Sequence, residues 1–273
     1  MPANAITTYQ LAQETGCSTE LCKMALERTH NDADEAKYIL SVWKGKSNEN
    51  ASNQFGTVCT FYDKDIKSAV VAEMKCDDEI FAGSKEFLNL TAEIVSEIAI
   101  YEHPYIHEPD IKKLNDEKKY NISFRSERFI KSSAHSLLTT YTHRNRIGVI
   151  LETQVENPLL INDKAFKQFS FNCAMHIAAF APLGVSRNDL PEEQRDTMVK
   201  QIEKELMRDG KEMKLWPIVI DGKINKWMEQ RSLLDQIFIK SEKDTVNDVR
   251  KSLGEQIGTN VVIKRFARIE FGK

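Results

Sequence analysis

The sequence has no marked excess of charge of either sign. It carries 38 Lys and Arg residues against 41 Asp and Glu residues, a formal net charge of −3 over 273 residues. A protein that holds nucleic acid by bulk electrostatics needs a basic surface, so nucleic acid is not an expected partner. With 41% hydrophobic and 29% charged residues, the composition is typical of a soluble globular protein.

Long hydrophobic runs are also missing. No uninterrupted apolar stretch approaches the ~20 residues of a membrane-spanning helix. The first residues, Met1 to Asn4, are not a charged head followed by an apolar run, so no secretory signal is visible. We expect no membrane association.

The cysteines show no disulfide or metal-binding pattern. An odd and scattered set fits reduced thiols in the cytosol better than a disulfide framework. The first two are five residues apart, which suits neither a zinc knuckle nor a shared helix face. The five are Cys17, Cys22, Cys59, Cys76 and Cys173.

Motifs for cofactors and catalysis are incomplete or missing. His103 and His107 have the spacing of metal ligands on a helix, but prolines at 104 and 109 argue against a helix, so we expect a loop with two ordinary histidines. Gly45-Lys46-Ser47 resembles the end of a phosphate-binding loop, but Leu40 stands where that loop needs glycine. Neither G-x-G-x-x-G nor G-x-S-x-G occurs. The sequence predicts no catalytic residue, no cofactor, no metal site and no direct nucleotide binding.

Residues 1–43 predict a compact unit of three helices. The pattern places helices at Tyr9–Thr15, from Ser18 to about Arg28, and from the capping-box pair Asp32 and Glu35 to Trp43. Such a unit usually displays a surface rather than housing a catalytic pocket. Residues 44–54 are polar and rich in Ser and Asn, which predicts a flexible linker. The predicted small core consists of Leu21, Met24, Ala25, Ala36, Ile39 and Leu40.

After the linker, two segments repeat each other at a distance of 79 residues. Each has matched strand positions and then a helix with large apolar residues at steps 0, 3, 7, 11 and 14. The matched strand positions are Thr60, Tyr62, Val70, Val71 and Glu73 in the first copy, and Thr139, Tyr141, Val149, Ile150 and Glu152 in the second. The helix positions are Phe87, Leu90, Ile94, Ile98 and Tyr101, and Phe166, Phe169, Cys173, Ile177 and Phe180.

The same region contains several β-like runs and an insertion. Strands are predicted near Thr57–Tyr62, Ser68–Met74 and Ile147–Thr153, with further runs at Asn121–Phe124, Ile237–Ile239 and Asn260–Ile269. Leu190-Pro191-Glu192-Glu193 resembles a helix start, and Asp209-Gly210 an end. A returning helix from about Pro217 to Gln230 would make an antiparallel hairpin, although an ordinary domain helix pair would show the same periodicity.

The predicted fold class is α+β. A three-helix module at 1–43 is followed by the linker at 44–54 and by a core of two pseudo-repeated α+β subdomains. We place these subdomains at 55–140 and 141–273, with the helical hairpin inserted at about 187–230.

Several motifs follow one another in the order of a known family. They run from Thr15-Gly16-x5-Cys22-Lys23-x-Ala25-Leu26 and Glu73-x2-Cys76-Asp77-Asp78-Glu79-Ile80-Phe81-Ala82-x4-Phe87 through His143-x2-Arg146-Ile147-Gly148-Val149 and Ala174-Met175-His176-Ile177-Ala178-Ala179 to Ile257-Gly258-Thr259-Asn260. Two further segments, Asp221–Trp227 and Leu233–Phe238, also fit. Together these motifs resemble the bacterial-type elongation factor Ts family.

The resemblance implies a guanine-nucleotide exchange factor for elongation factor Tu, the GTPase that delivers aminoacyl-tRNA. It implies that the N-terminal module is similar to a ubiquitin-associated (UBA) domain and that the factor binds both GDP-bound and nucleotide-free partner. The turn at Asp78, Glu79, Ile80 and Phe81 would wedge into the GTPase and disturb its Mg²⁺ and phosphate contacts. Other implied partner contacts are Thr19, Glu20, His143, Gln236 and Phe238.

Alternatives remain open from the sequence. The family's T-D-F-V segment is Asp78-Glu79-Ile80-Phe81 in this chain, and its Met-Met pair is Thr19-Glu20. These changes are compatible with a divergent scaffold that binds the GTPase without strong exchange activity, and an enzyme with an unrecognised site is a third class. Ile80 and Phe81 are also compatible with plain core packing at a helix start, and His176 with a satisfied interior position, which we favour for it.

Overall fold

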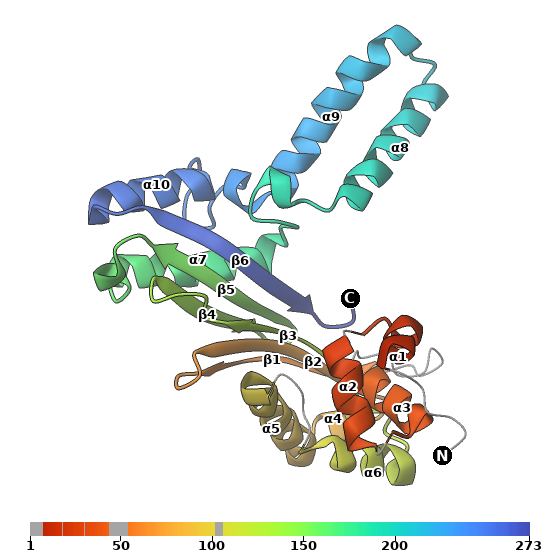
Figure 1. The fold of residues 1–273 in the computed structure, drawn as a ribbon. Helices are drawn as coiled ribbons and strands as arrows, with labels where there is room; N and C mark the ends of the chain where they lie inside the picture. The colour runs from red at the N-terminus through yellow and green to blue at the C-terminus, as the bar shows by residue number, and fades with distance from the viewer. Residues whose placement is uncertain (1–7, 18, 30, 44–53, 102–105) are drawn as a thin grey trace.

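The computed structural model describes residues 8–17, 19–29, 31–43, 54–101 and 106–273 (Figure 1). It is a mixed helix and sheet structure with two three-stranded sheets, so the α+β class is confirmed at this level. All of the predicted linker except Gln54 lies outside the described residues. None of the helices in the described ranges is long and apolar enough to cross a membrane.

The N-terminal helices form where the sequence predicts them, as α1 (Thr8–Thr15), α2 (Thr19–Arg28) and α3 (Ala33–Trp43). Asp32 caps α3, because its Oδ1 accepts hydrogen bonds from the backbone N–H groups of Asp34 at 3.0 Å and Glu35 at 2.9 Å. Their buried apolar residues include Leu11, Cys22, Ala25, Leu26, Ala36 and Leu40. The side chains of Leu21, Met24 and Ile39, also predicted for this core, lie outside what the structure describes.

The first sheet has the antiparallel order β1-β2-β3. Its strands are β1 (Phe55–Asp63), β2 (Ser68–Cys76) and β3 (Ser123–Ile130). Three helices connect β2 to β3: α4 (Glu79–Ala82), α5 (Lys85–Tyr101) and α6 (Glu108–Lys118).

The second sheet has the antiparallel order β4-β5-β6. Its strands are β4 (Ser136–His143), β5 (Ile147–Val155) and β6 (Val261–Glu270). The short η1 (Pro158–Leu160) and α7 (Lys164–Phe180) follow β5, and η4 (Leu233–Asp235) and α10 (Val246–Ile257) precede β6. The bounds of β5 and α7 lie 79 residues after those of β2 and α5.

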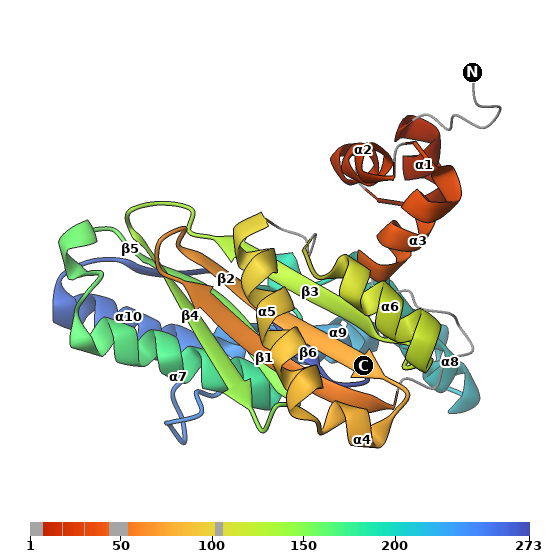
Figure 2. The same cartoon turned by 90° about the horizontal axis from the view of Figure 1, so that it is seen from below.

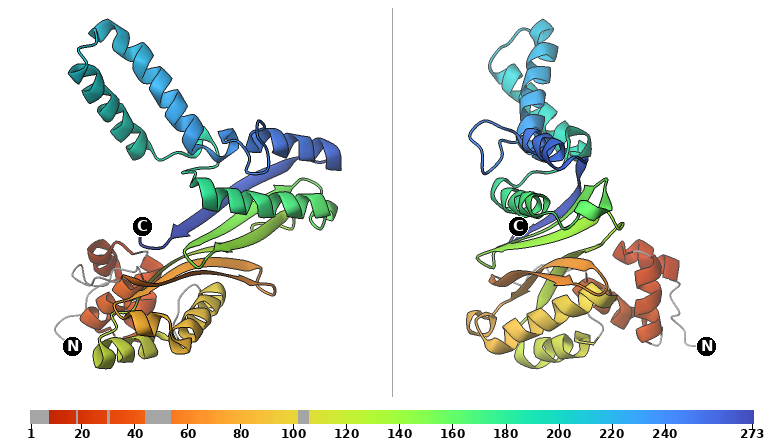
Figure 3. Two further views of the ribbon diagram at one scale, coloured as in Figure 1. Left: turned by 180° about the vertical axis from the view of Figure 1, so that it is seen from behind. Right: turned by 90° about the vertical axis from the view of Figure 1, so that its left-hand side faces the viewer.

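The two sheets pack face to face, with α5 and α7 on the outer faces (Figures 2 and 3). The middle strands β2 and β5 are buried along nearly their whole length because each is covered on both sides. Gly148 lies where the sheets approach closely, since an added Cβ would stand 2.6 Å from a side-chain methyl of Val71. The apolar layer between the sheets consists of Val58, Ala69, Val71, Phe129, Leu138, Ile150 and Ile269.

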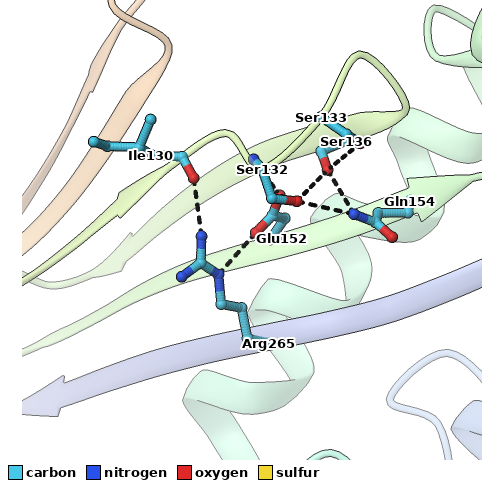
Figure 4. Close-up of polar contacts among 7 residues, drawn as sticks. All are labelled: Ile130, Ser132, Ser133, Ser136, Glu152, Gln154 and Arg265. Carbon is cyan, nitrogen blue, oxygen red and sulfur yellow. Dashed lines mark hydrogen bonds and ion pairs between the residues drawn. The ribbon is translucent and has the colours of Figure 1, made fainter.

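Each middle strand also carries one buried glutamate in an ion pair with an arginine of the third strand. Glu152 Oε2 lies 2.7 Å from the Nε of Arg265 (Figure 4), and Glu73 pairs in the same way with Arg125. Each arginine also donates to a backbone carbonyl of the other sheet, Arg265 to Ile130 at 2.9 Å and Arg125 to Glu270 at 2.8 Å. Reciprocal polar contacts therefore join the two sheets.

The helices α8 (Glu192–Arg208) and α9 (Trp216–Arg231) form an antiparallel hairpin that projects away from the sheets (Figure 1). Its own small core contains Ile202 and Leu206, which lie four residues apart on one face of α8, and Ile224 of α9. The short η2 (Arg187–Asp189) precedes the hairpin, and η3 (Met213–Leu215) lies between its helices.

Some sequence predictions need correction. Ile237–Ile239 is not a strand, because its only β-type pairing in the described structure is an isolated bridge between Ile237 and Thr245. The predicted subdomain boundary between 140 and 141 falls inside β4, whereas a division between Ile130 and Ser136 keeps both sheets whole. The run at Asn121–Phe124 marks just the beginning of β3, because β3 extends to Ile130.

The segment around His107 also differs from the prediction. Pro109 does not exclude a helix, because it lies in the first turn of α6, where its missing N–H is not needed. His107 is the residue before this helix, and its Nδ1 lies 2.8 Å from Glu97 Oε2 on α5 while its Nε2 lies 3.2 Å from Glu93 Oε2. His103 lies outside the described residues.

Candidate functional site

The acidic turn lies between the end of β2 and the start of α5, on the short helix α4. Asp78 is the N-cap of α4, with an extended backbone, and its Oδ1 accepts a hydrogen bond from Phe81 N at 2.6 Å. The Asp77 carboxylate accepts a hydrogen bond from Asn121 Nδ2, also at 2.6 Å. Glu79 is exposed in the first turn of α4. Of these three carboxylates, Glu79 is therefore the one that the turn presents to solvent.

The two large apolar residues of the turn point in opposite directions. Ile80 is 87% exposed, whereas Phe81 is 4% exposed. The Phe81 ring stacks on Tyr120 with centroids 4.0 Å apart and meets the edge of Phe87 at 5.4 Å. Phe81 therefore packs in the core, as one of the two interpretations of this pair expects. Ile80 is the apolar side chain of the turn that protrudes into solvent.

His143 lies at the exposed end of β4. Its Nδ1 is 3.2 Å from the hydroxyl of Tyr141, whose ring meets the edge of Phe171 at 5.8 Å. Phe171 is 41% exposed, so these residues form a surface aromatic cluster. The sequence analysis did not assign Tyr141 or Phe171 to this surface. Tyr141, two residues before His143 on the same strand, was a usable signal, whereas the contact with Phe171 depends on the packing of α7 against β4.

His176 is fully buried on α7 and fixes the segment that contains Gln236 and Phe238. Its Nδ1 accepts a hydrogen bond from Ile239 N at 3.1 Å, so its Nε2 carries the proton and donates to Gln236 Oε1 at 2.9 Å. Burial lowers the pKa of His176 below its usual value, and the hydrogen bond that His176 donates to Gln236 opposes that shift. The preferred interpretation of His176 as a satisfied interior residue is confirmed.

Gln236 and Phe238 line a surface cavity of about 480 Å³. Phe238 is 5% exposed and lies at its wall, while Ile237 at 46% and Phe180 at 50% offer more accessible apolar surface. The family resemblance named Gln236 and Phe238, and it gave no information on which side chains of this irregular segment are exposed.

The remaining predicted contacts are in the N-terminal module. Thr19 is exposed at the first position of α2, and the side chain of Glu20 lies outside the described residues. A hydrogen bond and a ring contact thus join Gln236 and Phe238 through His176, whereas the Asp78–Phe81 turn and His143 each have separate surroundings.

A metal centre would need several His, Cys, Asp or Glu side chains close together. Within the described ranges, no three His, Cys, Asp or Glu side chains are grouped so that they could hold a metal ion. Burial raises the pKa of the Cys59 thiol to about 12, which makes it a weak nucleophile and a poor metal ligand.

Comparison with known proteins gives one consistent family. A family model described as elongation factor TS matches residues 78–273. Elongation factor Ts of Bdellovibrio bacteriovorus is 28% identical, with 100% of this chain and 93% of that protein covered. Elongation factor Ts of Aquifex aeolicus is 28% identical with 96% of each chain covered, and that of Burkholderia thailandensis is 27% identical with 98% and 92% covered.

Proposed function

The chain belongs to the elongation factor Ts family, and on that premise we propose that it drives GDP release from elongation factor Tu through the Asp78–Phe81 turn. Family membership makes it a nucleotide exchange factor in translation elongation. The proposal concerns the residues that perform the exchange and the partner states that they distinguish.

An exchange factor works by differential binding rather than by covalent chemistry. It accelerates release when it binds the nucleotide-free GTPase more tightly than the GDP-bound form, because that difference shifts the partner toward the open state. Such a factor needs a protruding side chain that the open state accommodates, and it needs neither an active site nor a bound nucleotide of its own. We propose that this chain binds both partner states and has no catalytic residue.

The 87% exposure of Ile80 is the observation that carries the proposal. An apolar side chain so exposed, on a turn whose other ring is buried, gains contact area when a partner covers it. The neighbouring Glu79 is exposed and adds a carboxylate that would compete for the hydrogen bonds around the partner's Mg²⁺. Phe81 supports the turn from inside the chain.

The other contacts are proposed as secondary. Thr19 and Glu20 would meet the partner from a UBA-like N-terminal module, and His143, Gln236 and Phe238 from the second sheet-and-helix half. We propose that the two halves are related repeats, since Phe87 and Phe166 are both fully buried at corresponding positions of α5 and α7. The hairpin α8–α9 would be an insertion into the second repeat.

Release of a fluorescent GDP from elongation factor Tu tests the proposal. We expect the chain to accelerate release and Ile80→Ala to slow the accelerated rate roughly 5- to 150-fold, the usual range of a coupling energy. The thermal midpoint of Ile80→Ala should match that of the parent because the side chain is exposed. Tight binding without acceleration by the parent chain would instead indicate a scaffold, and an unchanged rate for Ile80→Ala would exclude the turn.

A further inference from the structure

The proposed turn rests on a residue from a different part of the chain. Tyr120 lies between α6 and β3, and its ring is nearly parallel to that of Phe81, with an interplanar angle of 10° and centroids 4.0 Å apart. Tyr120 is half-buried against the same core that contains Phe87. The aromatic pair therefore connects α4 to the segment that follows α6.

The backbone around Tyr120 is fixed for this contact. Its neighbours Lys119 and Asn121 both have left-handed backbone conformations, with φ of 59° and 48°. Such conformations are unfavourable for residues other than glycine and persist where surrounding contacts hold them. Two hydrogen bonds do so here: Asp77 N donates to Tyr120 O at 2.9 Å, and Asn121 Nδ2 donates to the Asp77 carboxylate at 2.6 Å.

A second clamp holds the same segment from the other side. Ile122 N donates to Asn115 Oδ1 at 2.6 Å, and Asn115 Nδ2 donates back to Ile122 O at 3.1 Å. Asn115 belongs to α6, so the segment between α6 and β3 is tied to α6 as well as to the acidic turn. Tyr120 thus projects from a rigid support.

The turn needs such a support. The helix α4 has four residues, too few to be stable by its own hydrogen bonds. If the Phe81 ring is fixed, the backbone of α4 is fixed, and the preceding side chain Ile80 is directed to the opposite, solvent side. Without the stack, Ile80 would sample several directions, and part of its contact energy with a partner would be lost in ordering it.

We infer that Tyr120 is a positioning residue for nucleotide exchange, acting through Phe81 on the direction of Ile80. This inference rests on the proposed function of the turn. Tyr120 need not touch the partner, and its contribution is the flat face on which Phe81 stacks, so the hydroxyl is dispensable.

The test is a double-mutant cycle in the GDP-release assay with the full chain. We expect Tyr120→Ala to lower the maximal accelerated rate by at least about 5-fold. Tyr120→Phe keeps the ring and should exchange within about 2-fold of the parent, a margin that matches ordinary additivity errors. In an Ile80→Ala background, Tyr120→Ala should cause no more than about a 2-fold further loss, because the residue through which it acts is gone.

A destabilised control separates positioning from general loss of folding. Phe129 is 8% exposed between the two sheets, away from α4, so Phe129→Ala should lower the thermal midpoint while the folded protein exchanges at the parental rate. A rate for Phe129→Ala as low as that of Tyr120→Ala would overturn the inference. So would a slow Tyr120→Phe, or an equal loss from Tyr120→Ala with and without Ile80.

The outcomes also distinguish the inference from the function on which it rests. If Ile80→Ala is slow and Tyr120→Ala is as fast as the parent, the positioning role is wrong and the turn keeps its function. If both variants exchange at the parental rate, the turn itself is not the exchange element.

Discussion

The two sheet-and-helix halves differ most in the connection that follows the middle strand. In the first half this connection carries Ile80. The corresponding residue of the second half, 79 positions later, is Leu159. Both side chains are 87% exposed. Asn157 Oδ1 accepts from Leu159 N at 3.1 Å, much as Asp78 accepts from Phe81. The turn after the middle strand thus exposes an aliphatic side chain in both halves.

The support behind these side chains is what separates the halves. Phe81 is buried, stacked on Tyr120 and in edge-to-face contact with Phe87, whereas Leu160, at the corresponding place, is half-buried in a three-residue 3-10 helix. If Ile80 is the exchange element and Leu159 is not, the difference lies in this support, because the two side chains are equally exposed. A rigidly held side chain loses less freedom when a partner covers it, so we assign exchange to the first half.

A second comparison concerns Glu97 and His176, which occupy corresponding positions of α5 and α7. Both are buried, and both accept hydrogen bonds from backbone N–H groups of a returning loop: Glu97 from Ile106 and His107, His176 from Ile239. The position requires an acceptor rather than a particular side chain. Because burial lowers the pKa of the histidine at this position, we expect the second half to lose stability on acidification.

The largest expected effect tests whether the two halves have equivalent cores. Phe87→Ala and Phe166→Ala each remove a fully buried ring beneath a sheet, so each should lower the free energy of unfolding by about 3–5 kcal/mol. Urea denaturation of both variants measures this. A large loss for one variant and less than about 1 kcal/mol for the other would contradict equivalent packing.

A smaller effect is expected for the duplicated ion pairs. Arg265→Met leaves the fully buried Glu152 without its cation, but Ser132 N at 2.9 Å and Ser132 Oγ at 2.6 Å still donate to it (Figure 4). The loss of unfolding free energy should therefore be about 1–3 kcal/mol. Arg125→Met should behave similarly at Glu73.

A matched surface variant provides the control for these arginines. Lys223 forms an exposed pair with Glu205 on the hairpin at 2.7 Å, and Lys223→Met should change the stability by less than about 1 kcal/mol. If the three Met variants were equally stable, the buried pairs would not hold the sheets together.

The pH effect at His176 should be smaller still. Burial depresses its folded-state pKa, so the unfolded chain binds more protons on acidification, and the stabilising effect is present above the usual value of about 6.5. Stability should fall as the pH drops below that value toward the folded-state pKa, by at most about 1.4 kcal/mol per pH unit from this one group.

His176→Gln isolates this contribution. Glutamine retains an acceptor and a donor but does not titrate in this range, so the variant should lose the part of the pH dependence that comes from position 176. Unfolding free energies measured for both proteins between pH 7.5 and 5.5 decide the matter. Identical pH profiles would show that His176 does not contribute.

The sequence predicts the secondary structure and the core of this protein better than its exposed surface. The matched apolar positions that begin at Phe87 and Phe166 all fall within α5 and α7, because helix periodicity directly reflects burial. The pairing of Glu73 with Arg125 was not predictable, since it depends on the register of strands far apart in the chain. Pro109 misled for a local reason: proline excludes a helix interior but favours its first turn.

The candidate site shows the same limit. The motif located the turn, but Ile80 and Phe81 are adjacent apolar residues, and their sequence gives no indication of which one is buried. That depends on Tyr120, which approaches from beyond α6. Tertiary contacts of this kind decide exposure at short helices, where no periodicity is available.

The most direct test of the central claim compares Ile80→Ala with Leu159→Ala in fluorescent GDP release from elongation factor Tu. The two substitutions remove equally exposed aliphatic side chains from corresponding turns, so neither should change the thermal midpoint. We expect Ile80→Ala to slow release at least about 5-fold while Leu159→Ala releases GDP at the parental rate. Equal rates for the two variants, whether both fast or both slow, would contradict the assignment of exchange to the Asp78–Phe81 turn of the first half.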